Sequence, residues 1–118
     1  MKDIADMLPG IERIQQRFLD MLKDRQGTIA HHVLAAWESK VAGEVVGHLD
    51  AAKAVLHQIA GSAGSLGFDE LGQAARDCEN EIISHLRSPE GELITLPAGL
   101  MKLLGNFLTL SKNLIGDS

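Results

Sequence analysis

Apolar residues recur at every third or fourth position along four blocks of this chain, the pattern of amphipathic helices. In the first block the pattern continues past Gly27, because one interior glycine costs a helix only about 1 kcal/mol relative to alanine. It predicts one long helix, or two nearly collinear ones, over residues 10–41, with Pro9 suited to the first turn. The periodic positions are Ile11, Ile14, Phe18, Leu22, Ile29, Val33 and Ala36, leading towards Trp37.

Three further helices follow from the same spacing. The second runs from Val45 to Leu66, and Gly67 is placed to end it as the residue after the last turn. The third is expected to begin at Asp69 as N-cap and to continue to about Leu86, where Ser88-Pro89-Glu90-Gly91 closes it. The fourth begins near Pro97 and carries its apolar positions on Leu100, Leu103, Leu104, Phe107, Leu110 and Leu114.

Four helices joined by short links predict an all-α fold, an antiparallel up-and-down four-helix bundle formed by one domain over residues 1–118. No alternation typical of strands and no internal repeat is present. Three further apolar residues, Met21, Trp37 and Cys78, are expected to pack in the core of this bundle.

Composition narrows the class of protein. Of the 118 residues 45% are apolar and 23% charged, which excludes a disordered chain. Aromatic residues reach only 3% and the net charge is −5, so nucleic-acid binding is not expected. No apolar run is long enough to span a membrane, and the single cysteine forms no internal disulfide, so we expect a cytoplasmic location.

The net charge is concentrated in one segment. Residues 69–92 hold seven acidic residues and two arginines, which accounts for the whole net charge of −5 when histidine is neutral. The simplest interpretation is the solvated face of one helix, and an interaction surface is the alternative.

The second helix carries an unusual face opposite its apolar positions. His57 is followed by Gly61 and Gly64 on the same side of the helix, and Lys53 precedes it by one turn. Two interior glycines together cost about 2 kcal/mol of helix propensity, so something is expected to approach this face closely. One possibility is another protein that docks beside a reactive imidazole, and the other is close helix packing within the bundle.

The segment around this histidine resembles the signature of histidine-containing phosphotransfer (HPt) domains. In that family a phosphorylatable histidine is followed by a glycine four residues later, then by small residues and a terminal glycine. The chain has His57-Gln58-Ile59-Ala60-Gly61-Ser62-Ala63-Gly64-Ser65-Leu66-Gly67-Phe68 and continues to Leu71. The chain departs from the family where many members carry a basic residue, since Ala60 stands three positions after the histidine and Gln58 directly after it.

The resemblance implies a phosphocarrier of a two-component phosphorelay that accepts and donates a phosphoryl group through His57. It implies response-regulator receiver domains and a hybrid histidine kinase as partners, and a monomer that is not itself an enzyme. No cofactor is expected, because the receiver domain would supply Mg²⁺ together with the acceptor aspartate. Lys53 is a candidate for the missing cation, although a solvated surface lysine is the simpler interpretation. The expected phosphate and docking face consists of Lys53, Gln58, Ala60, Gly61 and Gly64.

Two other functions stay open. A degenerate HPt-like bundle could bind a receiver or a kinase as an unphosphorylated adaptor or inhibitor, and the absence of a basic residue at Ala60 is the reason to consider it. The dimerisation bundle of a histidine kinase is disfavoured, because that motif usually has an acidic residue after the histidine and a proline nearby.

Other side chains give weaker signals. A zinc site is not expected from His31, His32 and His48, because none has a histidine or carboxylate partner at i+4. His85 lies near the end of the third helix, where it favours the helix dipole. Ser62 and Ser65 are interpreted as small packing residues and not as nucleophiles.

Overall fold

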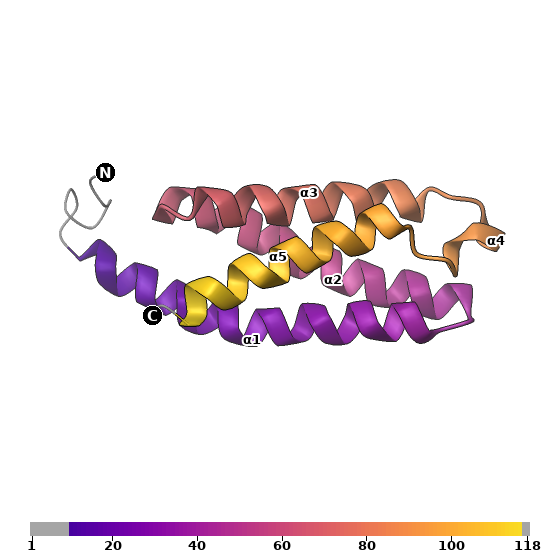
Figure 1. Ribbon diagram of the computed structural model, residues 1–118, viewed down its shortest axis with the longest axis horizontal. Coiled ribbons are helices and arrows are strands. Elements are labelled where there is room, and N and C mark those ends of the chain that lie inside the picture. The colour runs from indigo at the N-terminus through magenta and orange to yellow at the C-terminus, as the bar shows by residue number, and fades with distance from the viewer. Residues whose placement is uncertain (1–9, 117–118) are drawn as a thin grey trace.

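The computed structural model describes residues 10–116, and all its regular elements are helical. Four of the α-helices are long and one is short, and Figure 1 shows how they are arranged. Along the chain they are α1 (Ile11–Glu38), α2 (Ala42–Ala63), the single 3₁₀ turn η2 (Gly64–Leu66), α3 (Asp69–Leu86), α4 (Glu90–Leu93) and α5 (Ala98–Gly116). The predicted all-α class is confirmed, and Pro9 lies outside the described residues.

The long helices lie along the longest axis of the molecule, and α5 crosses the others obliquely (Figure 1). The main contacts join α1 to α2, α2 to α3, α3 to α5 and α5 back to α1. α2 therefore packs on α1 along one side and on α3 along the other. No helix within residues 10–116 is long and apolar enough to cross a membrane.

The core contains most of the periodic apolar positions that the sequence pattern identifies. Residues that are fully buried include Leu22 and Ile29 of α1, and Leu100, Leu104 and Phe107 of α5. From α2 and α3 the core takes Val45, Leu49, Ala52, Leu56, Ile59, Ala63, Leu71, Ala75, Cys78 and Ile82. Burial of this apolar surface stabilises the bundle by about 25 cal/mol per Å².

Two residues predicted to pack in the core are exposed. Met21 is 43% exposed and Trp37 54% exposed, so both predictions are wrong. Each lies beside the buried stripe of α1 and not on it: Leu22 and Ala36, their immediate neighbours in sequence, are buried, and adjacent residues of a helix point about 100° apart. Ile14, on the same helix, is also half exposed. Cys78, in contrast, is fully buried as predicted.

The end of the second helix follows the prediction for Gly67. This glycine adopts a left-handed conformation with φ of 90°. Its N–H donates to the carbonyl of Gly64 at 3.1 Å, and the N–H of Phe68 donates to the carbonyl of Ala63 at 2.8 Å. This pair of bonds is the Schellman arrangement that satisfies free carbonyls at a helix end. It reverses the chain so that α3 begins at once beside the end of α2.

Some expected helix boundaries are wrong. The first helix ends at Glu38 and not at residue 41, because Ser39 adopts an extended conformation. Asp69 is the first residue inside α3, while Phe68 occupies the N-cap position and makes no side-chain cap. Residues 90–93, expected to lie in a closing loop, form the short helix α4, with Pro89 at its N-cap. The buried His85 Nε2 contacts the Leu93 carbonyl at 2.9 Å, so this histidine fastens α4 to the last turn of α3 in addition to lying near the helix dipole.

Candidate functional site

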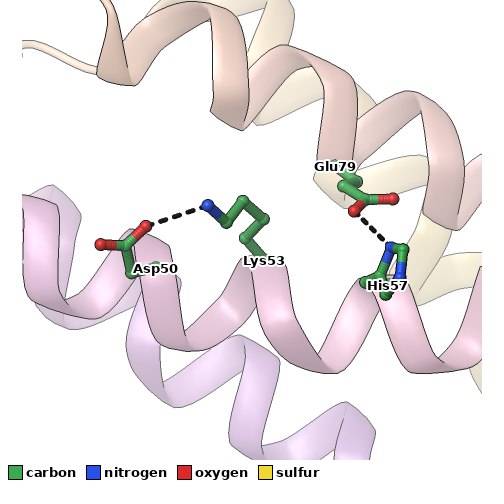
Figure 2. A network of polar contacts seen from close by, with 4 residues as sticks. All are labelled: Asp50, Lys53, His57 and Glu79. Atoms are coloured by element: carbon green, nitrogen blue, oxygen red, sulfur yellow. Dashed lines mark hydrogen bonds and ion pairs between the residues drawn. The ribbon is translucent and has the colours of Figure 1, made fainter.

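His57 lies on α2 with its imidazole largely in solvent and one ring nitrogen held by α3. The side chain is 75% exposed. Its Nδ1 lies 2.7 Å from Oε2 of Glu79, whose own side chain is only 15% exposed (Figure 2). A carboxylate accepts hydrogen bonds, so Nδ1 carries the proton and donates. In the neutral ring this leaves Nε2 with a free lone pair, and the nitrogen available for chemistry is therefore Nε2.

The glycines that follow His57 face open space. A Cβ placed on Gly61 would meet nothing within 4 Å, and one placed on Gly64 would meet only Asp69 Oδ1, at an ordinary 3.7 Å. Neither glycine is needed for close packing inside the described part of the bundle. The helix surface beside His57 is consequently bare and open to a partner.

Close packing of α2 on α3 depends instead on Gly72. A Cβ added there would lie 3.4 Å from Cβ of Ala63 and 3.5 Å from the backbone nitrogen of Gly64. Gly72 is buried, and it lies seven residues before Glu79 on the same side of α3. The short approach at Gly72 thus sets the register that brings Glu79 to His57.

The structure places only some residues of the predicted docking face beside His57. Gln58, Gly61 and Gly64 are exposed beside His57. Ala60 is not on that face, because it is only 8% exposed and its carbonyl points to the Gly72 position of α3. The inclusion of Ala60 in the phosphate and docking face is therefore wrong, because the tight α2–α3 contact buries this residue.

Lys53 is not directed at the imidazole. Its Nζ forms an ion pair with Oδ1 of Asp50 at 3.2 Å, and Figure 2 shows the amino group extended towards Asp50, away from His57. Lys53 still lines, with Ala54, His57, Gln58 and Glu79, a shallow hollow of about 420 Å³. It is the only lysine or arginine of α2.

A groove lies on the other side of α2, and Gln58, the residue after His57, lines it. Gln58, Ser62 and Leu66 form one wall of this groove, whose volume is about 440 Å³. The other wall comes from α1 and consists of Ile14, Arg17, Phe18, Met21 and Arg25. The exposure of Ile14 and Met21 therefore supplies apolar surface on the α1 wall of this groove.

The other candidate residues lie away from His57. His32 and His48 join α1 to α2 through their Nδ1 atoms, 2.9 Å apart, and the His31 ring lies 5.1 Å from that of His32 between centroids. Burial, followed by the neighbouring His31 and His48, lowers the pKa of His32. No group of three or more potential metal ligands is present within residues 10–116.

Three further side chains are unsuited to nucleophilic chemistry. Burial, aided by Asp77, raises the pKa of Cys78 to about 12, so this thiol is protonated at neutral pH. Ser62 donates to the Gln58 carbonyl at 3.1 Å and Ser65 to the Ser62 carbonyl at 3.0 Å. These hydroxyls are engaged with the backbone of their own helix.

Sequence reasoning did not identify Glu79 as part of the site. It placed this residue among the acidic side chains of a solvated helix face. The sequence gives one indication of its role: Glu79 directly follows the core residue Cys78 and so lies at the edge of the buried stripe of α3. Which residue of α2 it meets depends on the register between two helices, and periodicity within each helix does not contain that information.

Comparison with protein families gives one result that covers most of the chain. The family model described as the Hpt domain matches residues 13–110. Searches of curated proteins and of solved structures gave no match. The matched region includes α2, α3 and both members of the His57–Glu79 contact. The chain belongs to the Hpt domain family, whose members transfer phosphoryl groups through histidine in phosphorelays.

Proposed function

We propose that this chain is a phosphocarrier that accepts a phosphoryl group on Nε2 of His57 and passes it to an aspartate of a receiver domain. The observation that carries the proposal is the contact between Nδ1 and Glu79, which assigns the proton of the neutral ring to Nδ1 and directs the lone pair of Nε2 to the exposed side. The alternating directions of α1, α2, α3 and α5 in Figure 1 support the antiparallel four-helix arrangement on which such a carrier is built.

The chemistry required of this chain is limited. The lone pair of Nε2 attacks phosphorus, the P–N bond forms, and the bond from phosphorus to the donor's carboxylate oxygen breaks, with the electron pair leaving on that carboxylate. The ring keeps its Nδ1 proton and gains positive charge, which the Glu79 carboxylate stabilises through a charge-assisted hydrogen bond. Transfer to an acceptor aspartate is the reverse of this step.

The receiver domain would supply the rest of the machinery. Phosphoryl transfer passes through a loose transition state, so alignment and neutralisation of charge provide most of the rate enhancement. We propose that Mg²⁺ and the reacting aspartate come from that partner, and a hybrid histidine kinase is the proposed source of the phosphoryl group. The open surface at Gly61 and Gly64 lets such a partner approach Nε2 without obstruction.

The proposal is tested by phosphorylating the protein with a phosphorylated receiver domain and measuring its intact mass under neutral conditions. Wild-type protein is expected to gain the mass of one phosphate, and His57→Gln to gain none. His31→Gln is the matched control, because His31 is also an exposed histidine, and it should be labelled like the wild type. Exposed substitutions shift stability by only about 0.5 kcal/mol, so both variants should melt near the wild-type temperature.

The adaptor function makes the opposite prediction. If the wild type binds the receiver but gains no phosphate, the chain acts as an unphosphorylated adaptor or inhibitor. Retention of the phosphate by His57→Gln would instead contradict the assignment of the acceptor.

The docking surface is tested separately through Gly64. This residue lies about 10 Å along the helix from His57, too far to touch the phosphoryl group. Gly64→Arg should preserve the fold, because the backbone is right-handed helical there and the Cβ has room. We expect receiver binding and transfer to fall together by about tenfold, equivalent to about 1.4 kcal/mol, while phosphorylation by phosphoramidate is unchanged. Loss of the fold would show that Gly64 serves internal packing.

A further inference from the structure

The contact that orients His57 also creates an electrostatic problem for the phosphorylated protein. A phosphoryl group on Nε2 adds close to two negative charges. The Glu79 carboxylate already lies 2.7 Å from the other nitrogen of the same ring. The single positive charge that the ring gains offsets only part of the charge on the phosphoryl group and the carboxylate, so the two anionic groups still repel each other unless a further cation lies beside them. This inference rests on the proposed function and asks which residue of the chain supplies that cation.

The lysine of α2 is poorly placed for this purpose. Lys53 is already neutralised by Asp50 at 3.2 Å, and its amino group extends away from His57 (Figure 2). Arg17 and Arg25 lie on α1 and line the groove on the opposite side of α2, where Gln58 faces them. The two arginines thus lie on the wrong side of α2, and Lys53, although it lines the same hollow as His57 and Glu79, directs its amino group at Asp50.

Arg76 occupies the required position on α3. It follows Gly72 by four residues and precedes Glu79 by three, so the three residues share one side of the helix. Gly72 packs on Ala63 and Gly64, and Glu79 contacts His57, which fixes both ends of this stripe against α2. Arg76 therefore lies between the two contacts, about 4.5 Å along the axis from Glu79.

The arginine and the space in front of it are both free. Arg76 is exposed, and its guanidinium has no hydrogen bond or ion pair within residues 10–116. Across from it, Gly61 presents no side chain, and nothing lies within 4 Å of the place where its Cβ would be. A long, flexible guanidinium side chain can cross this space, because no other group holds it or blocks it.

We propose that Arg76 binds the phosphoryl group on His57, reaching across the open backbone at Gly61 to neutralise the charge that Glu79 would otherwise repel. The guanidinium presents a planar fork of N–H donors that matches two phosphoryl oxygens. The cation thus comes from the neighbouring helix. Gly61 keeps the path between Arg76 and the ring open.

The test measures phosphorylation by phosphoramidate, which needs no partner protein. Arg76→Gln should slow labelling of His57 about 5- to 20-fold and weaken its dependence on salt, since the attraction between exposed charges is screened by ions. Arg76→Lys should recover part of the rate, because it keeps the charge and loses the fork. In the wild type, phosphorylation should also shift the NMR signal of the Arg76 side-chain Nε–H.

Arg87→Gln is the matched control. Arg87 is exposed at the end of the same helix, about 16 Å further along, and its loss should leave the labelling rate unchanged. Equal rates for wild type, Arg76→Gln and Arg87→Gln would overturn the inference while leaving His57 as the acceptor. If Arg25→Gln slows labelling and Arg76→Gln does not, the inference is overturned and the phosphate contact is assigned to α1 instead. Absence of label on the wild type would contradict the proposed function itself.

Discussion

The two sides of α2 use histidine in opposite ways. On the side of α3, His57 donates from Nδ1 to the Glu79 carboxylate, and the ring stays exposed with Nε2 free. On the side of α1, the Nδ1 atoms of His32 and His48 face each other at 2.9 Å in a partly buried contact. One of these two rings must donate and the other accept. The first contact orients a ring that we propose is phosphorylated, and the second joins two helices only while at least one ring is neutral.

The two sides also differ in how closely the helices approach. Small residues bring α3 onto α2, with Gly72 against Ala63 and Gly64. Towards α1 the side chains leave a groove of about 440 Å³ beside Gln58 and Ser62. The closely packed side fixes the position of the His57 ring, whereas the α1 side leaves side chains exposed along a groove. The histidines on the two sides are the same residue type, so their different contacts come from the residue that each ring meets and from the distance between the packed helices.

The largest expected effect comes from forcing α3 away from α2 at Gly72. Gly72→Leu would place several carbon atoms where even a Cβ touches Ala63. Overpacking of this kind costs about 1 to 3 kcal/mol, and we expect the upper part of that range in urea unfolding. The displaced α3 should also separate Glu79 from His57 and slow labelling by phosphoramidate. Gly61→Leu, in open space on the facing helix, is the control and should not destabilise the protein; equal losses for both would refute the packing role of Gly72.

The hydrogen bond from Nδ1 of His57 is tested by replacing its acceptor, Glu79. Glu79→Leu removes the group that keeps the proton on Nδ1, and we expect labelling by phosphoramidate to slow about tenfold, equivalent to about 1.4 kcal/mol. Glu79→Gln retains an acceptor oxygen and should keep most of the rate. A faster reaction for Glu79→Leu would show that repulsion between carboxylate and phosphate outweighs the orientation of the ring.

A smaller effect is expected from filling the bare face. Gly61→Ala should stabilise the protein by about 0.5 to 1 kcal/mol in urea unfolding, because alanine favours the helix and its Cβ meets nothing. Gly47→Ala, equally open and on the same helix, should stabilise by a similar amount. Only Gly61→Ala is expected to slow transfer from a receiver domain. Identical transfer rates for the two variants would show that the partner does not approach Gly61.

The smallest effect concerns the histidine pair on the side of α1. The pKa of His32 is lowered in the folded protein, so between that pKa and the ordinary value of about 6.5 the unfolded chain binds more protons. The stability contributed by neutral His32 is complete above pH 6.5 and is lost as the pH falls through this window. Urea midpoints at pH 7.5 and 5.5 should therefore differ more for the wild type than for His32→Gln. The same difference in both proteins would contradict a role for this pair.

Much of the fold is determined by the sequence itself. The spacing of apolar residues placed the four long helices and most of their buried positions, because a helix must turn its apolar side to the core. Gly67 ended the second helix as expected, since glycine adopts the left-handed conformation without a steric penalty. The exposure of His57 followed from its phase relative to Leu56 and Ile59.

Only the tertiary structure decided which residues meet. The burial of Ala60, the exposure of Met21 and Trp37, and the pairing of Glu79 with His57 all depend on how each helix is rotated and shifted against its neighbours. A shift of one turn, about 5.4 Å, would bring a different residue of α3 to the ring while leaving every helix and its apolar spacing unchanged. Periodicity identifies the buried side of a helix, whereas the short approach at Gly72 selects the register in which α3 packs on it.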